Sequence, residues 1–284
     1  MSRSELRFNQ SSESLAFSET VSNEIVTRAP RRIVPRIRRI SDNMVSPVGH
    51  ESADFSRRVS PREFPEIMDG DCSYEDFRDC LRSLEKANRW LLGYRPTLTW
   101  LERLPRGLRR PTHIVDVGCG GGDLLRQIAG WARRRGIAVQ LTGVDLNPYA
   151  ARAAAESTPR ELGIKWVTGD ARVYRPEKPT DIVVSSLLAH HLEDEEIVAL
   201  LRRMEATVQL GWFINDLQRA EWSCRMFGLL RWKHPIMRHD GLVSFRRAFR
   251  KEDWVRLLAA ADVPREVVTV ERWRPGRLCV GRWK

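Results

Sequence analysis

The clearest sign of a ligand-binding site in the sequence is a glycine-rich turn. Residues 113–117 form a short β-branched run that predicts a buried parallel strand, and glycines follow at once. From Asp123 onward the apolar residues recur at helical spacing, so the segment predicts a strand, a tight turn and a helix. Gly118 and Gly120 can adopt positive φ and carry no Cβ, which lets a ligand lie directly against the backbone. The helix that follows directs its free N–H groups at that ligand.

The residues around the turn indicate which ligand it suits. A dinucleotide fingerprint that starts at Gly118 would place its third glycine at position 123, where Asp123 would repel a pyrophosphate. The Gly-Lys-Ser/Thr of a phosphate loop is also missing. Asp116, just before the first glycine, instead suits a ligand that carries an ammonium group. A purely structural turn is the alternative interpretation.

Strands and helices alternate around this turn. A helical run at 73–104, broken at Pro96, precedes it, and strands are predicted at 138–144, 163–167, 181–186 and 209–215. Helices are predicted at 149–157, 193–208 and 244–261, and strands 266–273 and 278–283 form a closing hairpin that turns at Pro275-Gly276. This order predicts an α/β fold with a mostly parallel sheet that helices cover on both faces. Ligands of such sheets bind beyond the carboxyl ends of the strands.

Polar side chains stand at those carboxyl ends. Asp145 ends the second strand, where a carboxylate can accept hydrogen bonds from both hydroxyls of a ribose. Capping of the helix that begins at Asn147-Pro148 is the alternative role for Asp145. Asp170 follows the third strand, and Ser185 lies at the end of the fourth.

The run Val-Asp-Val-Gly-Cys-Gly-Gly-Gly resembles motif I of the class I S-adenosylmethionine-dependent methyltransferases, and three further motifs follow in order over residues 110–216. The stretch Phe-x-x-Glu-Asp-Trp, residues 249–254, looks like the small-molecule methyltransferases of quinones and polyketides. The resemblance implies a Rossmann-like seven-stranded sheet with a closing antiparallel hairpin, an N-terminal helical extension, and S-adenosylmethionine as cofactor. The resemblance also implies a set of cofactor-binding residues, in which Asp170 accepts the adenine amino group: Asp116, Gly118, Cys119, Gly120, Asp145, Leu146, Asp170, Ala171 and Ser185. Cys119 lies inside the glycine turn and is interpreted there as a small packing residue rather than a nucleophile.

Adjacent histidines follow the fourth strand. Methyl transfer is an in-line displacement that needs an aligned nucleophile, sometimes a base, and no metal. Histidine is the side chain most easily poised as a base near neutral pH, so His190 or His191 is the candidate catalytic residue, and a structural histidine is the alternative. Asn215-Asp216 ends the fifth strand and can orient the acceptor, but Asp216 can equally pair with Arg219 or cap a helix.

The acceptor is expected to be small, hydrophobic or phenolic, and methylated at oxygen. An apolar stretch from Trp222 to Trp232 is suited to line its pocket, or to form a lid or an oligomer contact. Residues 217–284 hold 16 Lys and Arg against 7 Asp and Glu, so an RNA or protein methyltransferase that uses this basic surface is an alternative. A protein that binds the cofactor without catalysis is another, and the oligomeric state stays open.

Length, cysteine content and apolar runs limit the class of protein to which this sequence can belong. The 284 residues suit one α/β domain with an extension, and the five scattered cysteines predict neither a disulfide framework nor a zinc site. With no apolar run of membrane-spanning length and no secretory signal, a cytoplasmic location is expected. Residues 1–65 are interpreted as a basic leader that is disordered or loosely attached, 66–108 as a helical segment that covers the active site, and 109–284 as the methyltransferase domain.

Overall fold

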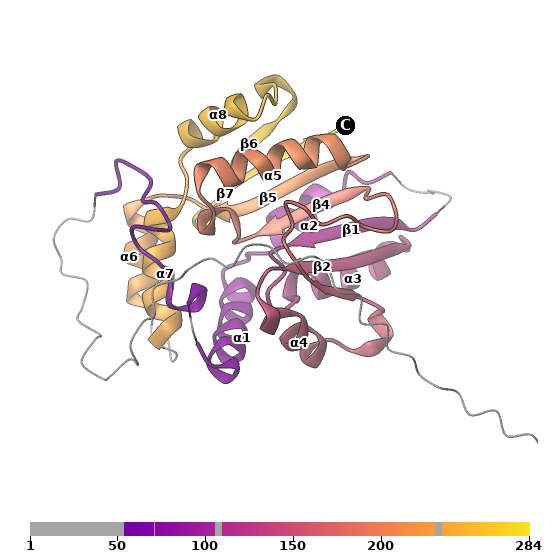
Figure 1. The fold of residues 1–284 in the computed structure, drawn as a ribbon, viewed down its shortest axis with the longest axis horizontal. Helices are drawn as coiled ribbons and strands as arrows, with labels where there is room; N and C mark the ends of the chain where they lie inside the picture. Colours follow the sequence, from indigo (N-terminus) through magenta and orange to yellow (C-terminus); the bar gives the residue numbers. More distant parts are fainter. Residues whose placement is uncertain (1–53, 71, 106–109, 231–234) are drawn as a thin grey trace, which may run out of the picture. The chain divides into compact units, whose positions relative to one another are not determined.

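A seven-stranded sheet lies at the centre of the chain in the computed structural model, which describes residues 54–70, 72–105, 110–230 and 235–284 (Figure 1). The strand order is β3-β2-β1-β4-β5-β7-β6. β1 to β5 pair in parallel, while β7 runs antiparallel to both β5 and β6. The predicted fold class is therefore confirmed. The strands are β1 (Thr112–Val117), β2 (Val139–Asp145), β3 (Lys165–Thr168), β4 (Ile182–Ser186), β5 (Gly211–Leu217), β6 (Thr269–Trp273) and β7 (Arg277–Trp283).

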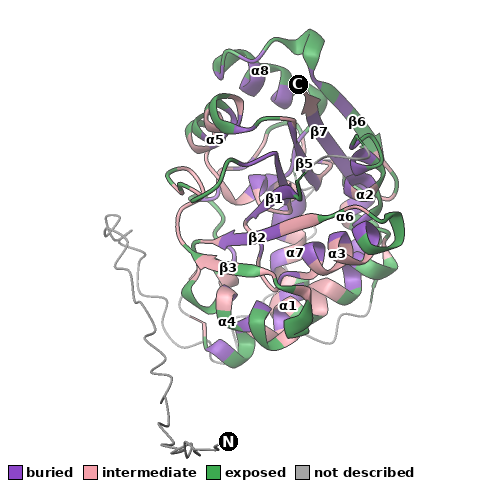
Figure 2. Ribbon diagram, turned by 90° about the vertical axis from the view of Figure 1, so that its right-hand side faces the viewer, coloured by how far each residue is buried: buried purple, intermediate pink, exposed green. Residues whose placement is uncertain are grey.

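Helices cover the sheet on both faces. Apolar side chains of α2 (Arg95–Leu101) and α3 (Asp123–Arg135) pack on one face, and those of α5 (Asp194–Thr207) and α8 (Lys251–Ala260) pack on the other. Alternate residues of β1 supply the two cores, with Ile114 in the first and Val115 in the second. Figure 2 shows the result as a largely buried central sheet. Both faces of β1 are buried, as the continuous β-branched run predicts.

The strand order reverses between β1 and β4, because β2 continues on one side of β1 and β4 on the other. The turns after these two strands therefore diverge to opposite faces of the sheet and leave room for a ligand at their carboxyl ends. The glycine turn and the histidine pair both lie at this edge, since each follows one of these two strands.

Local chemistry explains why the helices begin where they do. Asn147 caps α4 (Pro148–Ser157) through a 2.9 Å bond from the Tyr149 N–H, with Pro148 at the first helical position, as the sequence predicts. α3 is preceded instead by Gly122 as its N-cap residue, which has a left-handed φ of 73° and offers no side-chain cap. A Cβ at Gly122 would lie 2.3 Å from the Trp166 ring, so backbone conformation and packing both require glycine there.

Two predicted helices differ in the structure. The run at 244–261 is two helices, α7 (Pro235–Arg247) and α8, because residues 248–250 are not helical and Phe249 forms a β-bridge with Gln218. The break in the first helical run is not at Pro96. It falls between α1 (Tyr74–Trp90) and α2, where Leu92 has positive φ, and Pro96 lies in the first turn of α2, where proline is tolerated.

The remaining elements are α6 (Glu221–Leu229) and short 3₁₀ turns η1 (Ile67–Asp69), η2 (Arg160–Leu162), η3 (Ala189–His191) and η4 (Arg265–Val267).

Of the residues interpreted as a leader, 1–53 lie outside the described residues, whereas Val59 is buried and its N–H bonds to the Arg246 carbonyl. Among the described helices, none is both long and apolar enough to span a membrane.

Candidate functional site

The glycine turn is fixed to the neighbouring strand by hydrogen bonds. The Gly118 N–H donates to the Val144 carbonyl at 2.8 Å, and the Gly120 N–H donates to Asp145 Oδ2 at 2.8 Å. Gly118 and Gly120 both have left-handed φ, as expected. Asp145 thus ties the end of β2 to the turn, while its Oδ1 accepts from the Asn147 N–H at 2.9 Å. Each carboxylate oxygen has a second lone pair that remains available to a ligand hydroxyl.

Two buried polar atoms at this edge have no partner within the described part of the chain. They are Oδ1 of Asp116, in β1, and Oγ of Ser185, in β4. Burial raises the pKa of Asp116, and the nearby carboxylates of Asp123 and Asp145 raise it further. A buried carboxylate of this kind is stabilised by a cation. The site therefore fits a ligand that brings an ammonium group and a polar atom to the strand ends.

The other predicted cofactor residues lie around the turn in varied environments. Cys119 is buried, which agrees with a packing role, and Leu146 is 61% exposed beyond β2. Ala171 is half-buried. The Asp170 carboxylate forms a bidentate ion pair with Arg172, at 2.6 Å from Nη2 and 2.9 Å from Nε. An adenine amino group would have to share Asp170 with this guanidinium.

The turn is covered by α1 and by the loop after β4. Leu81 of α1 packs over Gly120 and Gly121, and Leu188 lies against Gly118 so closely that a Cβ there would fall 2.8 Å from its side chain. The N-terminal helical segment thus reaches the glycine turn. The cover brings the loop that carries the histidines next to the first glycine.

His190 is paired with Asp216 across β4 and β5. Its Nδ1 lies 2.7 Å from Asp216 Oδ1, and its backbone N–H donates to the other carboxylate oxygen at 3.2 Å. Because an ionised carboxylate only accepts, Nδ1 carries the proton and Nε2 carries a lone pair. Burial lowers the pKa of His190, although Asp216 opposes this shift. Burial likewise opposes charge on Asp216, yet His190 holds the pKa of Asp216 below its usual value.

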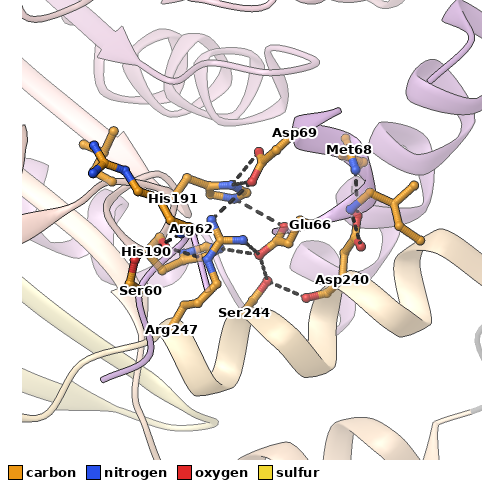
Figure 3. Close-up of polar contacts among 12 residues, drawn as sticks. Ser60, Arg62, Glu66, Met68, Asp69, His190, His191, Asp240, Ser244 and Arg247 are labelled. Atoms are coloured by element: carbon orange, nitrogen blue, oxygen red, sulfur yellow. Dashed lines mark hydrogen bonds and ion pairs between the residues drawn. The ribbon is translucent and has the colours of Figure 1, made fainter. Parts of the chain in front are cut away.

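His191 faces two carboxylates that come from residues 66–69 (Figure 3). Its Nδ1 lies 2.9 Å from Asp69 Oδ1, and its Nε2 lies 3.6 Å from Glu66 Oε2. Burial alone would lower the pKa of His191, but Glu66 and Asp69 outweigh it and raise that pKa to about 9. Burial raises the pKa of Asp145, and the charge of His191 opposes this shift. The loop that carries the histidine pair also contacts the glycine turn, because Leu188 packs on Gly118.

Arg247 joins α7 to this group. Its Nη1 lies 3.0 Å from Glu66 Oε1, its Nη2 lies 3.2 Å from Asp69 Oδ2, and its Nε donates to the His190 carbonyl at 3.1 Å. Ser244 Oγ also donates to Glu66 Oε1 at 2.8 Å. Burial alone would raise the pKa of Asp69, but His191 and Arg247 outweigh burial and lower that pKa.

Sequence reasoning missed Glu66, Asp69, Ser244 and Arg247. Glu66 lies more than 120 residues from the histidines and Arg247 more than 55, so no local spacing connects them. It also offered three roles for Asp216, and neither pairing with Arg219 nor helix capping is observed. Arg219 pairs instead with Asp253 at 2.7 Å. The stretch expected to line a pocket leaves Trp222, Met226 and Leu229 of α6 exposed to solvent, and its residues 231 and 232 lie outside the described ones.

Comparisons with known proteins agree with this geometry. Residues 114–211 match the family model described as "Methyltransferase domain". The trans-aconitate 2-methyltransferase of Mycobacterium tuberculosis (strain H37Ra) is 39% identical over 106 residues, which is 37% of this chain and 37% of that protein. The chain thus matches well under half the length of this curated relative.

Solved structures show the same fold. The plantazolicin methyltransferase BpumL, in complex with a desmethylplantazolicin analogue and S-adenosylhomocysteine, has a TM-score of 0.54 at 16% identity, over 73% of this chain and 90% of that one. Human N-acetylserotonin methyltransferase, in complex with S-adenosylmethionine, has a TM-score of 0.55 at 17% identity, over 75% and 56% of the two chains. The match to a methyltransferase domain over residues 114–211 and the shared fold together bear out the resemblance to the class I S-adenosylmethionine-dependent methyltransferases.

Proposed function

We propose that this protein transfers the methyl group of S-adenosylmethionine to an oxygen of a small-molecule acceptor. The sulfonium cofactor supplies an activated methyl carbon when bound, so the chain has to align the acceptor and remove its proton. In this proposal Asp116 receives the ammonium group, Asp145 and Leu146 receive the ribose and adenine, and Gly118 to Gly120 form the backbone surface between them. The buried, unpartnered Oδ1 of Asp116 supports that assignment.

His190 is the proposed base. Asp216 holds its Nδ1–H at 2.7 Å and thereby fixes the tautomer that leaves the Nε2 lone pair for the acceptor hydroxyl. This pair, at the carboxyl ends of β4 and β5, is the single observation that carries the proposal. His191 has a raised pKa and is held by two carboxylates, so its proposed role is to attract and orient an anionic acceptor oxygen.

The acceptor proposed here has an acidic hydroxyl, such as a phenol. A phenol has a pKa of about 10, so a single histidine can accept its proton as the methyl group is transferred. Trans-aconitate, the compound in the name of the M. tuberculosis relative, is also small, but the similarity covers only 37% of this chain. We therefore propose the class of the acceptor and not its identity.

The test is methyl transfer from labelled S-adenosylmethionine into a panel of phenols and small carboxylic acids, with His190→Gln and Asp216→Asn. Loss of the base should lower kcat by at least about 100-fold while cofactor affinity stays within about twofold. His239→Gln is the matched control, because His239 pairs with Asp240 and lies outside the proposed base pair. Near-normal turnover in both His190→Gln and Asp216→Asn would refute the base, and absence of transfer to every acceptor would leave only cofactor binding.

A further inference from the structure

Two imidazole Nε2 atoms and one carboxylate converge in the cluster formed by Glu66, His190 and His191. Their ligand atoms all lie within 4.8 Å of one another. Glu66 and His190 are almost fully buried, at 4% and 2% exposed. Figure 3 shows the adjacent histidines, on the stretch after β4, near Glu66, which comes from a separate segment of the chain. From this convergence we propose that Glu66, His190 and His191 bind one divalent transition-metal ion of the zinc class.

The distances are those of a site that needs little contraction. His190 Nε2 lies 3.8 Å from Glu66 Oε1, and His191 Nε2 lies 3.6 Å from Glu66 Oε2. Both separations exceed a hydrogen bond. Two ligands placed about 2.1 Å from a tetrahedral zinc ion are about 3.4 Å apart, so the two histidine–carboxylate separations need to shorten by only a few tenths of an ångström.

Each histidine is also held from behind by a carboxylate. Asp216 binds Nδ1 of His190 at 2.7 Å, and Asp69 binds Nδ1 of His191 at 2.9 Å. Metal-binding histidines almost always donate their second N–H in this way, because it fixes the tautomer and turns the Nε2 lone pair to the ion. In both rings Nδ1 is held by a carboxylate and Nε2 faces Glu66. The carboxylates behind the rings are an observation independent of the convergence of the three ligands.

Charge favours a cation at this point. Glu66, Asp69 and Asp216 are three carboxylates, and Arg247 pairs with the first two of them. A divalent ion would take the place of the proton on His191, because metal binding releases the protons of its ligands. Arg247 and Ser244 both hold Glu66 Oε1, which immobilises the carboxylate and leaves Oε2 directed at His191.

The donor set determines the class of metal. Imidazole nitrogens suit zinc, cobalt, nickel and copper, whereas magnesium and calcium prefer oxygen ligands throughout. A bound ion would occupy the His190 lone pair that the proposed function assigns to the base. Metal-loaded protein should therefore lose methyl transfer, and this consequence alone depends on the proposed function.

The test uses full-length, tag-free protein treated with EDTA and dialysed, then titrated calorimetrically with Zn²⁺. The expected result is one ion per chain, with affinity reduced by more than about 100-fold in His191→Gln and Glu66→Gln, since even loss of an outer carboxylate costs about 10- to 100-fold. His239→Gln should bind like the wild type, and Asp69→Asn, at a partly exposed position, should lie between them. Thermal unfolding of each metal-free variant establishes that it is folded.

Cobalt substitution separates this site from the five cysteines. A visible absorption spectrum of tetrahedral nitrogen and oxygen ligation supports the proposal, and a thiolate charge-transfer band contradicts it. No zinc binding, or equal binding by folded His191→Gln and Glu66→Gln, overturns the proposal while leaving the methyltransferase assignment intact. Zinc binding at these residues without inhibition of transfer supports the metal site and removes His190 as the base.

Discussion

Asp116 lies at the strand ends with a buried carboxylate oxygen that no described residue hydrogen-bonds. Its carboxylate is 2% exposed, its pKa is raised by burial, and its Oδ1 has no partner among the described residues. A structural aspartate at such a place would be expected to accept backbone N–H groups, as Asp145 does. The unpartnered oxygen therefore supports the proposal that Asp116 receives a cationic group of the ligand.

This leads to a prediction on pH. A carboxyl whose pKa is raised in the free protein and lowered beside a ligand ammonium releases a proton on binding, so affinity should rise with pH. We expect the affinity for S-adenosylhomocysteine to increase as the pH rises through the range in which Asp116 loses its proton and the ligand amino group keeps its own. In Asp116→Asn the increase should disappear. Calorimetry at several pH values checks this, and an unchanged pH slope in the variant would contradict it.

At the scale of the elements, the join between the glycine turn and α3 depends on Gly122. Replacement by alanine forces a left-handed φ on a residue with a Cβ and drives that Cβ into Trp166. We expect Gly122→Ala to lower the free energy of unfolding by about 2–4 kcal/mol, from conformational strain and overpacking together. Urea denaturation measures the change.

Gly136 provides the comparison, because it also has a left-handed φ, of 65°, at the end of α3, but a Cβ there would meet no atom within 4 Å. Gly136→Ala should cost only the conformational strain of about 1–2 kcal/mol. Equal losses in the two variants would show that contact with Trp166 contributes nothing.

A second element, the segment of residues 54–70, delivers Glu66 and Asp69 to the histidines and is anchored by Arg58. The Arg58 side chain donates to the Leu192 carbonyl at 2.6 Å, to the Arg247 carbonyl at 2.9 Å and to Asp194 at 2.6 Å, and it stacks on the Phe249 ring. Burial lowers its pKa, although Asp194 counteracts this. The anchor therefore connects the segment to the loop after β4 and to the end of α7.

We predict that Arg58→Ala lowers the free energy of unfolding by about 2–3 kcal/mol, because it leaves buried carbonyls and Asp194 without their charged donor. The neighbouring Arg57 forms an exposed pair with Glu63, so Arg57→Ala should leave stability unchanged. Limited proteolysis should also cleave residues 54–70 faster in Arg58→Ala than in Arg57→Ala. Identical denaturation curves for the two variants would exclude the anchoring role.

Local signals in the sequence were enough to predict the sheet and the glycine turn. The β-branched run of β1, the Asn147-Pro148 cap and the Pro275-Gly276 turn are each determined by residues close together in the chain. The split between α7 and α8 was not predicted, because the bridge of Phe249 to Gln218 overrides a run that reads as continuous helix. The Glu66 and Arg247 contacts depend on tertiary packing and leave no mark on local spacing.

On the scale of the whole molecule, the proposed cofactor residues and the proposed base lie in two neighbouring regions of one sheet edge. The ends of β1 and β2 present the glycine turn with Asp116 and Asp145, and the ends of β4 and β5 present His190 and Asp216. Residues 54–70 and α7 supply the charges that hold the histidines. The net charge of +11 is a property of the whole sequence that neither region requires.

The most direct measurement of the central claim is calorimetric titration of the full-length protein with S-adenosylhomocysteine and, separately, with NADH. An acidic glycine turn that prefers an ammonium group to a pyrophosphate predicts one molecule of S-adenosylhomocysteine per chain and no heat from NADH. Uptake of NADH with no response to S-adenosylhomocysteine would contradict the assignment.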